Sequence, residues 1–118
     1  MATNYEHLEI WKESMNLAEK IYMITKKFPK EEIFGVTSQL RRAVSSISAN
    51  VAEGSGRKSK KEFSQFVSIA YGSLCEVENF VELSRRLDYI SSTEQEEIVE
   101  KTTMLGKKLN AFRNYLQK

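Results

Sequence analysis

The 118-residue sequence contains a single cysteine, Cys75, and a single histidine, His7. One cysteine cannot form an internal disulfide, and a zinc site needs several nitrogen or sulfur ligands, so neither a disulfide scaffold nor a metal site is predicted. Cys75 stands beside apolar positions of a helical pattern, which predicts a small buried side chain rather than a nucleophile. His7 stands near the start of a predicted helix, where we expect it to be exposed.

The sequence also lacks the common catalytic and cofactor motifs. It has no Glu-x-x-His pair, the motif by which helical bundles hold two iron ions. The "GSG" at residues 54–56 does not have the spacing of a phosphate-binding G-x-x-x-x-G-K-[ST] loop. We therefore expect no catalytic residue, no cofactor and no enzymatic activity.

Long apolar runs are absent as well. No stretch approaches the roughly 18 apolar residues of a membrane-spanning helix, and the first residues, "MATNYEHLEI", do not resemble a secretion signal. Together with the lone cysteine, this favours a cytoplasmic protein with no membrane partner. With 41% hydrophobic and 29% charged residues, the composition is that of a globular chain. Its length fits a single domain over residues 1–118.

Proline and glycine are scarce, with one proline, Pro29, and five glycines. Pro29 and Gly35 mark one break, Gly54 and Gly56 mark a second, and the stretch "YISSTEQEE" holds a third. Each of the four segments between these breaks has apolar residues at steps of three or four. The pattern predicts helices over about residues 6–27, 37–55, 60–88 and 93–117. Because short loops join the four amphipathic helices, the predicted fold is all-α, an antiparallel up-down four-helix bundle.

Each predicted helix has an apolar stripe that we expect to face the core. In chain order, the stripes contain Leu8, Trp11, Met15, Ala18, Ile21, Tyr22, Thr25 and Phe28; Val36, Leu40, Val44, Ile47 and Val51; Phe63, Phe66, Val67, Ala70, Leu74, Val77, Val81 and Leu87; and Ile98, Thr102, Leu105, Leu109, Phe112 and Leu116. Ser59 and Glu62 predict a capping box at the start of the third helix. Ser91 or Ser92 is predicted to cap the fourth.

The second helix has a further stripe, and this one is polar. Its residues, called the polar stripe below, are Gln39, Arg42, Ser46, Asn50 and Glu53, and Arg57 extends it. Such a stripe is compatible with a solvated face. However, Ser and Asn are poorer helix formers than the Lys and Glu of most exposed faces, and a charge ladder through Asn50 would suit a contact with one fixed register. We therefore expect a packing surface, either inside the bundle or between subunits.

A run of positive charge follows the second helix. Arg57, Lys58, Lys60 and Lys61, called the basic corner below, lie within five residues, and Arg41 extends the patch only if it faces the same way. Cations in the first turn of the third helix oppose the helix dipole, so local stability does not require them there. An ordinary charged loop is one interpretation. The other is a phosphate-contacting corner, helped by the N–H groups of the helix start.

The stretch "FPKEEIFGVTSQLRRAVSSISANVAEGSGRKSKKEFSQFVSIAYGSLCEVE" resembles the core of a small bacterial four-helix-bundle family, most specifically in "SI-x-AN-x-AEG". The founding members of that family are encoded in intervening sequences of 23S ribosomal RNA genes. A related branch is the accessory variability determinant protein of diversity-generating retroelements. The resemblance implies a ring-like homopentamer without enzymatic activity. It also implies a role with nucleic acid, since the retroelement branch binds reverse transcriptase and RNA or DNA.

Two functional hypotheses follow from these features. In the first, a homo-oligomeric bundle binds RNA, DNA or a nucleoprotein partner through the basic corner, with Arg41 as a further contact, and assembles through the polar stripe. In the second, the protein is an adaptor for another protein, for example a reverse transcriptase, with little direct contact to nucleic acid. Pull-down that survives nuclease and high salt would distinguish the second from the first.

Overall fold

The computed structural model describes residues 4–118 of the chain. Four α-helices make up most of it: α1 (Glu9–Thr25), α2 (Val36–Ser55), α3 (Lys60–Arg86) and α4 (Ser92–Leu116). Two short 3-10 helices, η1 (Asn4–His7) and η2 (Lys30–Glu32), precede α1 and α2. The described residues contain no β-strand. The four predicted helices are therefore confirmed, with bounds that differ by three residues at most.

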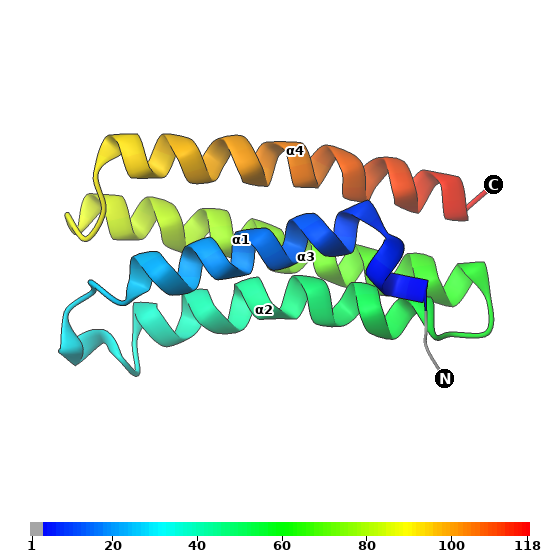
Figure 1. The fold of residues 1–118 in the computed structure, drawn as a ribbon, viewed down its shortest axis with the longest axis horizontal. Helices are drawn as coiled ribbons and strands as arrows, with labels where there is room; N and C mark the ends of the chain where they lie inside the picture. Colours follow the sequence, from blue (N-terminus) through cyan, green and yellow to red (C-terminus); the bar gives the residue numbers. More distant parts are fainter. Residues whose placement is uncertain (1–3) are drawn as a thin grey trace.

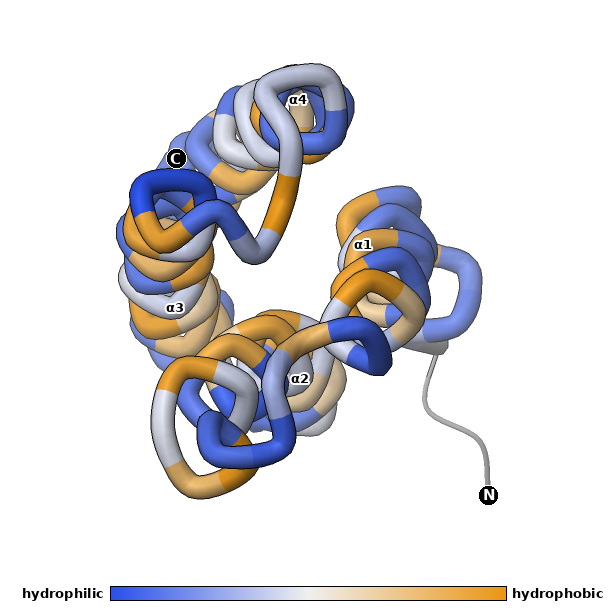
Figure 2. Tube along the Cα trace, turned by 90° about the vertical axis from the view of Figure 1, so that its left-hand side faces the viewer, coloured by the Kyte–Doolittle hydropathy of each residue, from blue (hydrophilic) through white to orange (hydrophobic). Residues whose placement is uncertain are grey.

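Consecutive helices run in opposite directions, so the chain passes up and down an elongated body of 43 × 26 × 19 Å (Figure 1). The end view shows the helices in chain order around a common interior, with α2 between α1 and α3 (Figure 2). The α2–α3 connection and the end of α4 lie at one end of the bundle, and the α1–α2 and α3–α4 connections lie at the other (Figure 1).

The interior is filled by the apolar stripes of all four helices. The predicted stripes of α2 and α4 are confirmed, since Val44, Ile47 and Val51 are fully buried and Leu105 and Leu109 are buried as well. Complete burial of a valine, leucine or isoleucine side chain contributes roughly 1.5–3 kcal/mol to stability. In α3, however, Leu87 is 45% exposed, because the helix ends at Arg86 and the chain turns away there.

The predicted stripe of α1 is partly wrong, because the buried face is rotated around the helix. Met15 and Tyr22 are about two-fifths exposed, whereas Ile10, Ser14 and Leu17, which lie outside the predicted stripe, are buried. Ile21 and Thr25 are buried as predicted. The two hydroxyl residues interrupt the apolar pattern of this face. Both are satisfied locally, since Ser14 Oγ donates to the carbonyl oxygen of Ile10 at 2.6 Å and Thr25 Oγ1 donates to that of Ile21 at 2.8 Å.

The predicted cap of α4 is confirmed, whereas the capping box predicted for α3 is only half formed, because the Glu62 carboxylate lies near the Ser59 hydroxyl instead of its backbone N–H. Ser91 and Glu94 form a reciprocal capping box at α4, and the Ser59 hydroxyl accepts from the backbone N–H of Glu62 at α3. A longer-range cap begins α2, where the Glu32 carboxylate accepts from the backbone N–H of Val36 at 3.2 Å and from the Tyr89 hydroxyl at 2.7 Å. These bonds, that of Tyr89 foremost, lower the pKa of Glu32. They join the α1–α2 connection to the α3–α4 connection.

Gly54 sets how closely α2 approaches α3. A Cβ atom at this position would lie 2.7 Å from Phe66 Cβ and 2.8 Å from Phe63 Cδ1, distances that the two helices cannot accommodate without moving apart. Gly72 in α3 is the opposite case, since a Cβ atom there would meet nothing within 4 Å. The two glycines therefore allow steric crowding to be separated from helix propensity.

We predict that Gly54→Ala lowers the free energy of unfolding by about 1–3 kcal/mol, because the added methyl group overpacks the α2–α3 contact. Gly72→Ala is the matched control and should raise stability by about 0.5–1 kcal/mol, since alanine favours helix and nothing obstructs it. Urea denaturation followed by circular dichroism measures both. Equal effects of the two substitutions would contradict the steric role of Gly54.

Candidate functional site

The basic corner lies in the α2–α3 connection and the first turn of α3, at the end of the bundle where α4 also ends (Figure 1). Arg57 is engaged locally, because Nη2 lies 2.6 Å from Glu53 Oε2 and the guanidinium carbon lies 4.7 Å from the Phe66 ring centroid. Lys60 reaches α4, where its Nζ lies 5.4 Å from the centre of the Tyr115 ring. These contacts bring residues of α2, α3 and α4 together.

Lys58, Lys60 and Lys61 are exposed, and the ion pairs among residues 4–118 include none of the three. Residues 53–62 contain four cations and two carboxylates, a net charge of +2, which equals the formal net charge of the whole chain. The remaining residues sum to zero but are not evenly balanced, since residues 101–118 contain five cations and no carboxylate. The basic corner is therefore a dense cationic cluster, but it is not the only cationic stretch of the sequence. Such a corner attracts anions, most effectively those that carry several phosphates.

The N-terminus of α3 adds less to this corner than the sequence indicated. The N–H of Glu62 is already bonded to Ser59 Oγ at 3.1 Å, and a Glu62 carboxylate oxygen lies 3.3 Å from the same hydroxyl. A carboxylate thus already occupies the positive end of the helix dipole. The lysine side chains, rather than the helix start, are the groups available to an anion.

Arg41 does not belong to the basic corner. It lies 14 residues before Ser55, the last residue of α2, a rise of roughly 21 Å along the helix from the end that leads into the basic corner. Its Nε donates to Thr25 Oγ1 at 2.9 Å, and its guanidinium carbon lies 4.9 Å from the Tyr22 ring centroid. Arg41 therefore packs α2 against α1. It does not face the same way as the basic corner and so does not extend it.

The polar stripe divides into an inner and an outer part. Ser46 and Asn50 are half-buried: Ser46 Oγ accepts from Ser73 Oγ of α3 and from Asn50 Nδ2, both at 2.9 Å. These bonds lie inside the bundle, at the α2–α3 contact. The predicted charge ladder through Asn50 is wrong, because Asn50 bonds only to Ser46 and the ladder reduces to the Glu53–Arg57 pair.

The outer part of the polar stripe consists of Gln39, Arg42 and Glu53, which are exposed. Two of them, Gln39 and Arg42, line a shallow groove of about 190 Å³ together with Ala43, Ser46 and Glu76 of α3. Arg42 and Glu76 share this groove without an ion pair between them. The groove thus holds an unpaired cation and an unpaired carboxylate on the outer face of α2 and α3.

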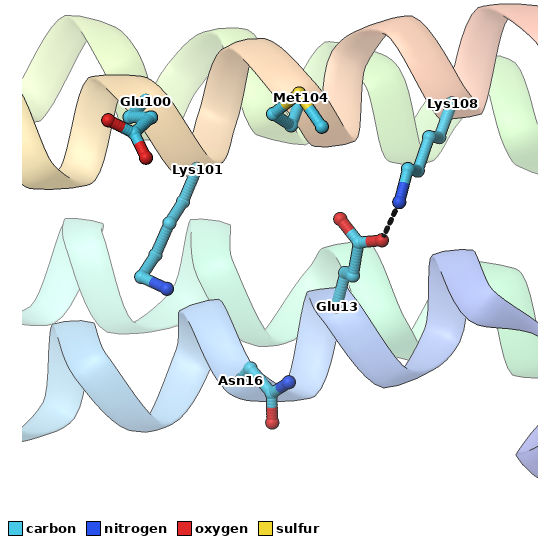
Figure 3. Close-up of a pocket in the computed structure, with 6 residues that line it drawn as sticks. All are labelled: Glu13, Asn16, Glu100, Lys101, Met104 and Lys108. Carbon is cyan, nitrogen blue, oxygen red and sulfur yellow. Dashed lines mark hydrogen bonds and ion pairs between the residues drawn. The ribbon is translucent and has the colours of Figure 1, made fainter.

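Sequence analysis missed the seam between α1 and α4. Lys108 of α4 reaches two carboxylates of α1, those of Glu9 at 2.8 Å and of Glu13, and the Glu13 contact is drawn in Figure 3. Two further ion pairs, Lys27–Glu94 at 2.7 Å and Lys20–Glu97 at 3.8 Å, cross the same seam. By themselves, the basic residues near the end of α4 indicate only a favourable dipole interaction, because the acidic partners lie some hundred residues earlier.

A groove of about 330 Å³ runs along this seam, and Figure 3 shows its lining. Glu13, Asn16, Glu100, Lys101, Met104 and Lys108 line it. Two carboxylates and two lysines balance one another, and Lys108 is already paired with Glu13. The groove has no excess of either charge, so we assign it a role in holding α1 to α4.

Cys75 is exposed, so the prediction of a buried side chain is wrong. The core positions of α3 are Leu74 and Val77, and Cys75 is turned about 100° from Leu74. His7 is exposed, as predicted. Within residues 4–118, no three His, Cys, Asp or Glu side chains are placed to hold a metal ion. None of the helices in that range is long and apolar enough to cross a membrane.

Comparison with known proteins gives a family and a fold. The family described as "23S rRNA-intervening sequence protein" matches residues 6–111 of the chain. A crystal structure from Bacteroides thetaiotaomicron, described as a protein with unknown function from the S23 ribosomal protein family, is similar with a TM-score of 0.79. The two sequences are 26% identical over 88% of this chain and 97% of that chain. Curated proteins gave no match.

The α1–α4 ion pairs predict a pH dependence of stability. The Lys108 ammonium lowers the pKa of Glu9 below its ordinary 4.5, and the carboxylates of Glu13 and Glu9 raise the pKa of Lys108 above 10.5. The contribution of Glu9 to stability is therefore complete above pH 4.5 and is lost as the pH falls through the lowered pKa of Glu9. The contribution of Lys108 to stability is lost only as the pH rises above 10.5, through the raised pKa of Lys108.

We predict that Lys108→Met, which keeps the aliphatic stem but removes the charge, is less stable than the wild type near neutral pH. The difference should shrink as the pH falls below 4.5 and through the lowered pKa of Glu9, and high salt should shrink it too. Urea midpoints across the pH range measure it. Lys101→Met, in the same groove but outside the ion pairs, is the control; a Lys108→Met deficit that persists in acid would contradict the ionic explanation.

Proposed function

Because the chain belongs to the 23S rRNA-intervening sequence protein family, we propose that it is a non-enzymatic, cytoplasmic protein that binds RNA or DNA through the basic corner. The observation that carries this proposal is the group of four cations within residues 57–61. Lys58, Lys60 and Lys61 are exposed and stand outside the ion pairs of the described residues. Phosphate groups are the ligands that such a cluster suits best.

We also propose that the protein assembles as a ring-like homopentamer, as the resemblance to the retroelement branch of bundles implies. The groove between α2 and α3 supports a subunit contact, because Arg42 and Glu76 are both available there to a neighbouring molecule. The same outer face of α3 exposes Ile69 and Leu83 by 52% and 40%. Five copies of the basic corner in one ring would bind a polyanion by avidity, since each weak phosphate contact is repeated.

A protein adaptor is the second candidate function, and one feature of the α1–α2 connection favours it. Phe34 is 94% exposed and its neighbour Ile33 is 49% exposed, at the end of the bundle opposite the basic corner. Exposed apolar side chains that lie together are typical of protein contacts. In this alternative, the partner is a protein such as a reverse transcriptase, and nucleic acid is contacted little.

We predict that the double variant Lys60→Glu/Lys61→Glu binds structured RNA and duplex DNA at least tenfold more weakly than the wild type at low salt. Each phosphate that the variant no longer binds also lowers the salt dependence of affinity, by about one unit in the slope of log K against log salt. Gel-shift titrations at about 50 and about 200 mM salt measure both quantities.

The matched control is Lys26→Glu/Lys30→Glu, which makes the same charge change on exposed lysines at the opposite end of the bundle. It should lower affinity much less than the Lys60/Lys61 variant. Absence of wild-type binding at low salt would overturn the proposed function. Equal losses in the two double variants would show that the net charge, and not the basic corner, is responsible.

For assembly, we predict a mass in solution of five times the 13.6 kDa chain. Arg42→Glu should shift the mass toward smaller species, because it places two carboxylates in the α2–α3 groove beside each other. Light scattering coupled to size exclusion at micromolar concentration measures the mass. Lys26→Glu, which makes the same charge change on an exposed side chain outside the ion pairs of the described residues, is the control and should leave the mass unchanged. A monomeric wild type would contradict the assembly.

A further inference from the structure

Tyr115 is an exposed aromatic residue within reach of the basic corner. Its side chain is 57% exposed near the end of α4, and Lys60 Nζ lies 5.4 Å from its ring centroid. The Tyr115 ring also packs against other aromatic residues. Its centroid lies 6.0 Å from that of Phe112, and the Phe112 ring packs edge-on against Phe63 with a centroid distance of 5.2 Å. Sequence analysis did not connect this residue with the lysines of the basic corner.

Two shallow grooves meet the end of α4 beside this ring. One, of about 470 Å³, is mostly apolar and is lined by Tyr115 and Phe112 together with His7, Leu8, Ile10, Ala111 and the ion-paired Glu9 and Lys108. The other, of about 460 Å³, is lined by Lys61, Ser64, Gln65, Leu116 and Gln117. The end of the bundle therefore offers an aromatic, apolar surface next to a surface with a lysine at its edge.

A phosphate backbone alone requires only the lysines, but the aromatic ring suits a further ligand group. A nucleobase has an apolar face that stacks on tyrosine, and it is accessible only where the base is not already stacked and paired in a duplex. Lysine beside an aromatic platform places the cation where the phosphate next to a stacked base lies. The combination is therefore the chemistry that recognises single strands, loops or unpaired ends.

Resting on the proposed function, we propose that Tyr115 is a stacking residue for an unpaired base, with Lys60 and Lys61 binding the adjacent phosphates. The ligand class is single-stranded nucleic acid, in preference to a regular duplex. RNA and DNA share this chemistry, so the two are separate arms of the test. The grooves beside Tyr115 receive the base and the backbone of the same strand.

The molecule provides its own control for this assignment. Tyr22 of α1 is 41% exposed, and the Arg41 guanidinium carbon lies 4.9 Å from its ring centroid, so a cation and a tyrosine are paired there as well. That cation, however, is already bonded to Thr25, and the pair lies far along the bundle from the basic corner. Tyr22→Ala removes an equivalent ring without touching the proposed site.

The experiment measures binding of the full chain to short oligonucleotides that carry the fluorescent base 2-aminopurine. Single-stranded RNA, single-stranded DNA and the corresponding duplexes are compared at low salt. For the wild type, we expect tighter binding of single strands and quenching of the 2-aminopurine fluorescence, which reports stacking. Tyr115→Ala should weaken single-strand binding roughly 5- to 100-fold and abolish the quenching, whereas Tyr115→Phe should retain both.

The outcomes separate the stacking role of Tyr115 from phosphate binding by the basic corner. Losses confined to Tyr115→Ala, with Tyr22→Ala and Tyr115→Phe unchanged and circular dichroism intact, support the stacking role. Binding that is equal for duplex and single strand, or unaffected by Tyr115→Ala, overturns the stacking role and leaves phosphate binding by the basic corner in place. Absence of binding to every oligonucleotide overturns the proposed function itself.

Discussion

The close contact between α2 and α3 is the constraint on which the rest of this molecule depends. Gly54 lets the aromatic residues Phe63 and Phe66 lie directly against the α2 backbone. On the core side of α2, Val44, Ile47 and Val51 are completely removed from solvent. A hydrogen bond between Ser46 and Ser73 joins the two helices halfway along. Van der Waals attraction weakens steeply with separation, so the two helices are most stable at this close spacing. The connection that joins them must therefore be short.

The basic corner lies in that connection and in the first turn of α3. Because the two helices are held close, residues 56–59 make a short turn, and the lysines that follow project toward the end of α4. The seam between α1 and α4 is held differently, by ion pairs between exposed or half-exposed side chains. Exposed ion pairs contribute less than apolar packing and weaken with salt. The bundle thus has a close α2–α3 contact that ends at the basic corner, and a more sparsely packed α1–α4 seam that ion pairs cross.

Much of the fold could be predicted from the sequence, and the failures have a common cause. The helix bounds and the inner faces of α2 and α4 follow from residues three and four apart, whose relation is fixed by the helix itself. The face of α1 was misplaced at Ile10, Ser14 and Leu17, because the hydroxyl of Ser14 is satisfied on the preceding turn and the residue is buried like an apolar one. Cys75 was predicted to be buried because it follows the core residue Leu74 in the sequence. Successive residues of a helix point about 100° apart, so Cys75 faces solvent.

The sequence by itself determined four amphipathic helices, their order, and the run of lysines after α2, because periodicity, capping residues and charge are local properties of the chain. Only the tertiary structure decided which distant residues meet. Lys60 lies over Tyr115, Arg41 turns to Thr25 and away from the basic corner, and Lys108 reaches Glu9 across the bundle. The register between packed helices sets these pairings, and it depends on the shape of every side chain in the contact, which no local pattern contains.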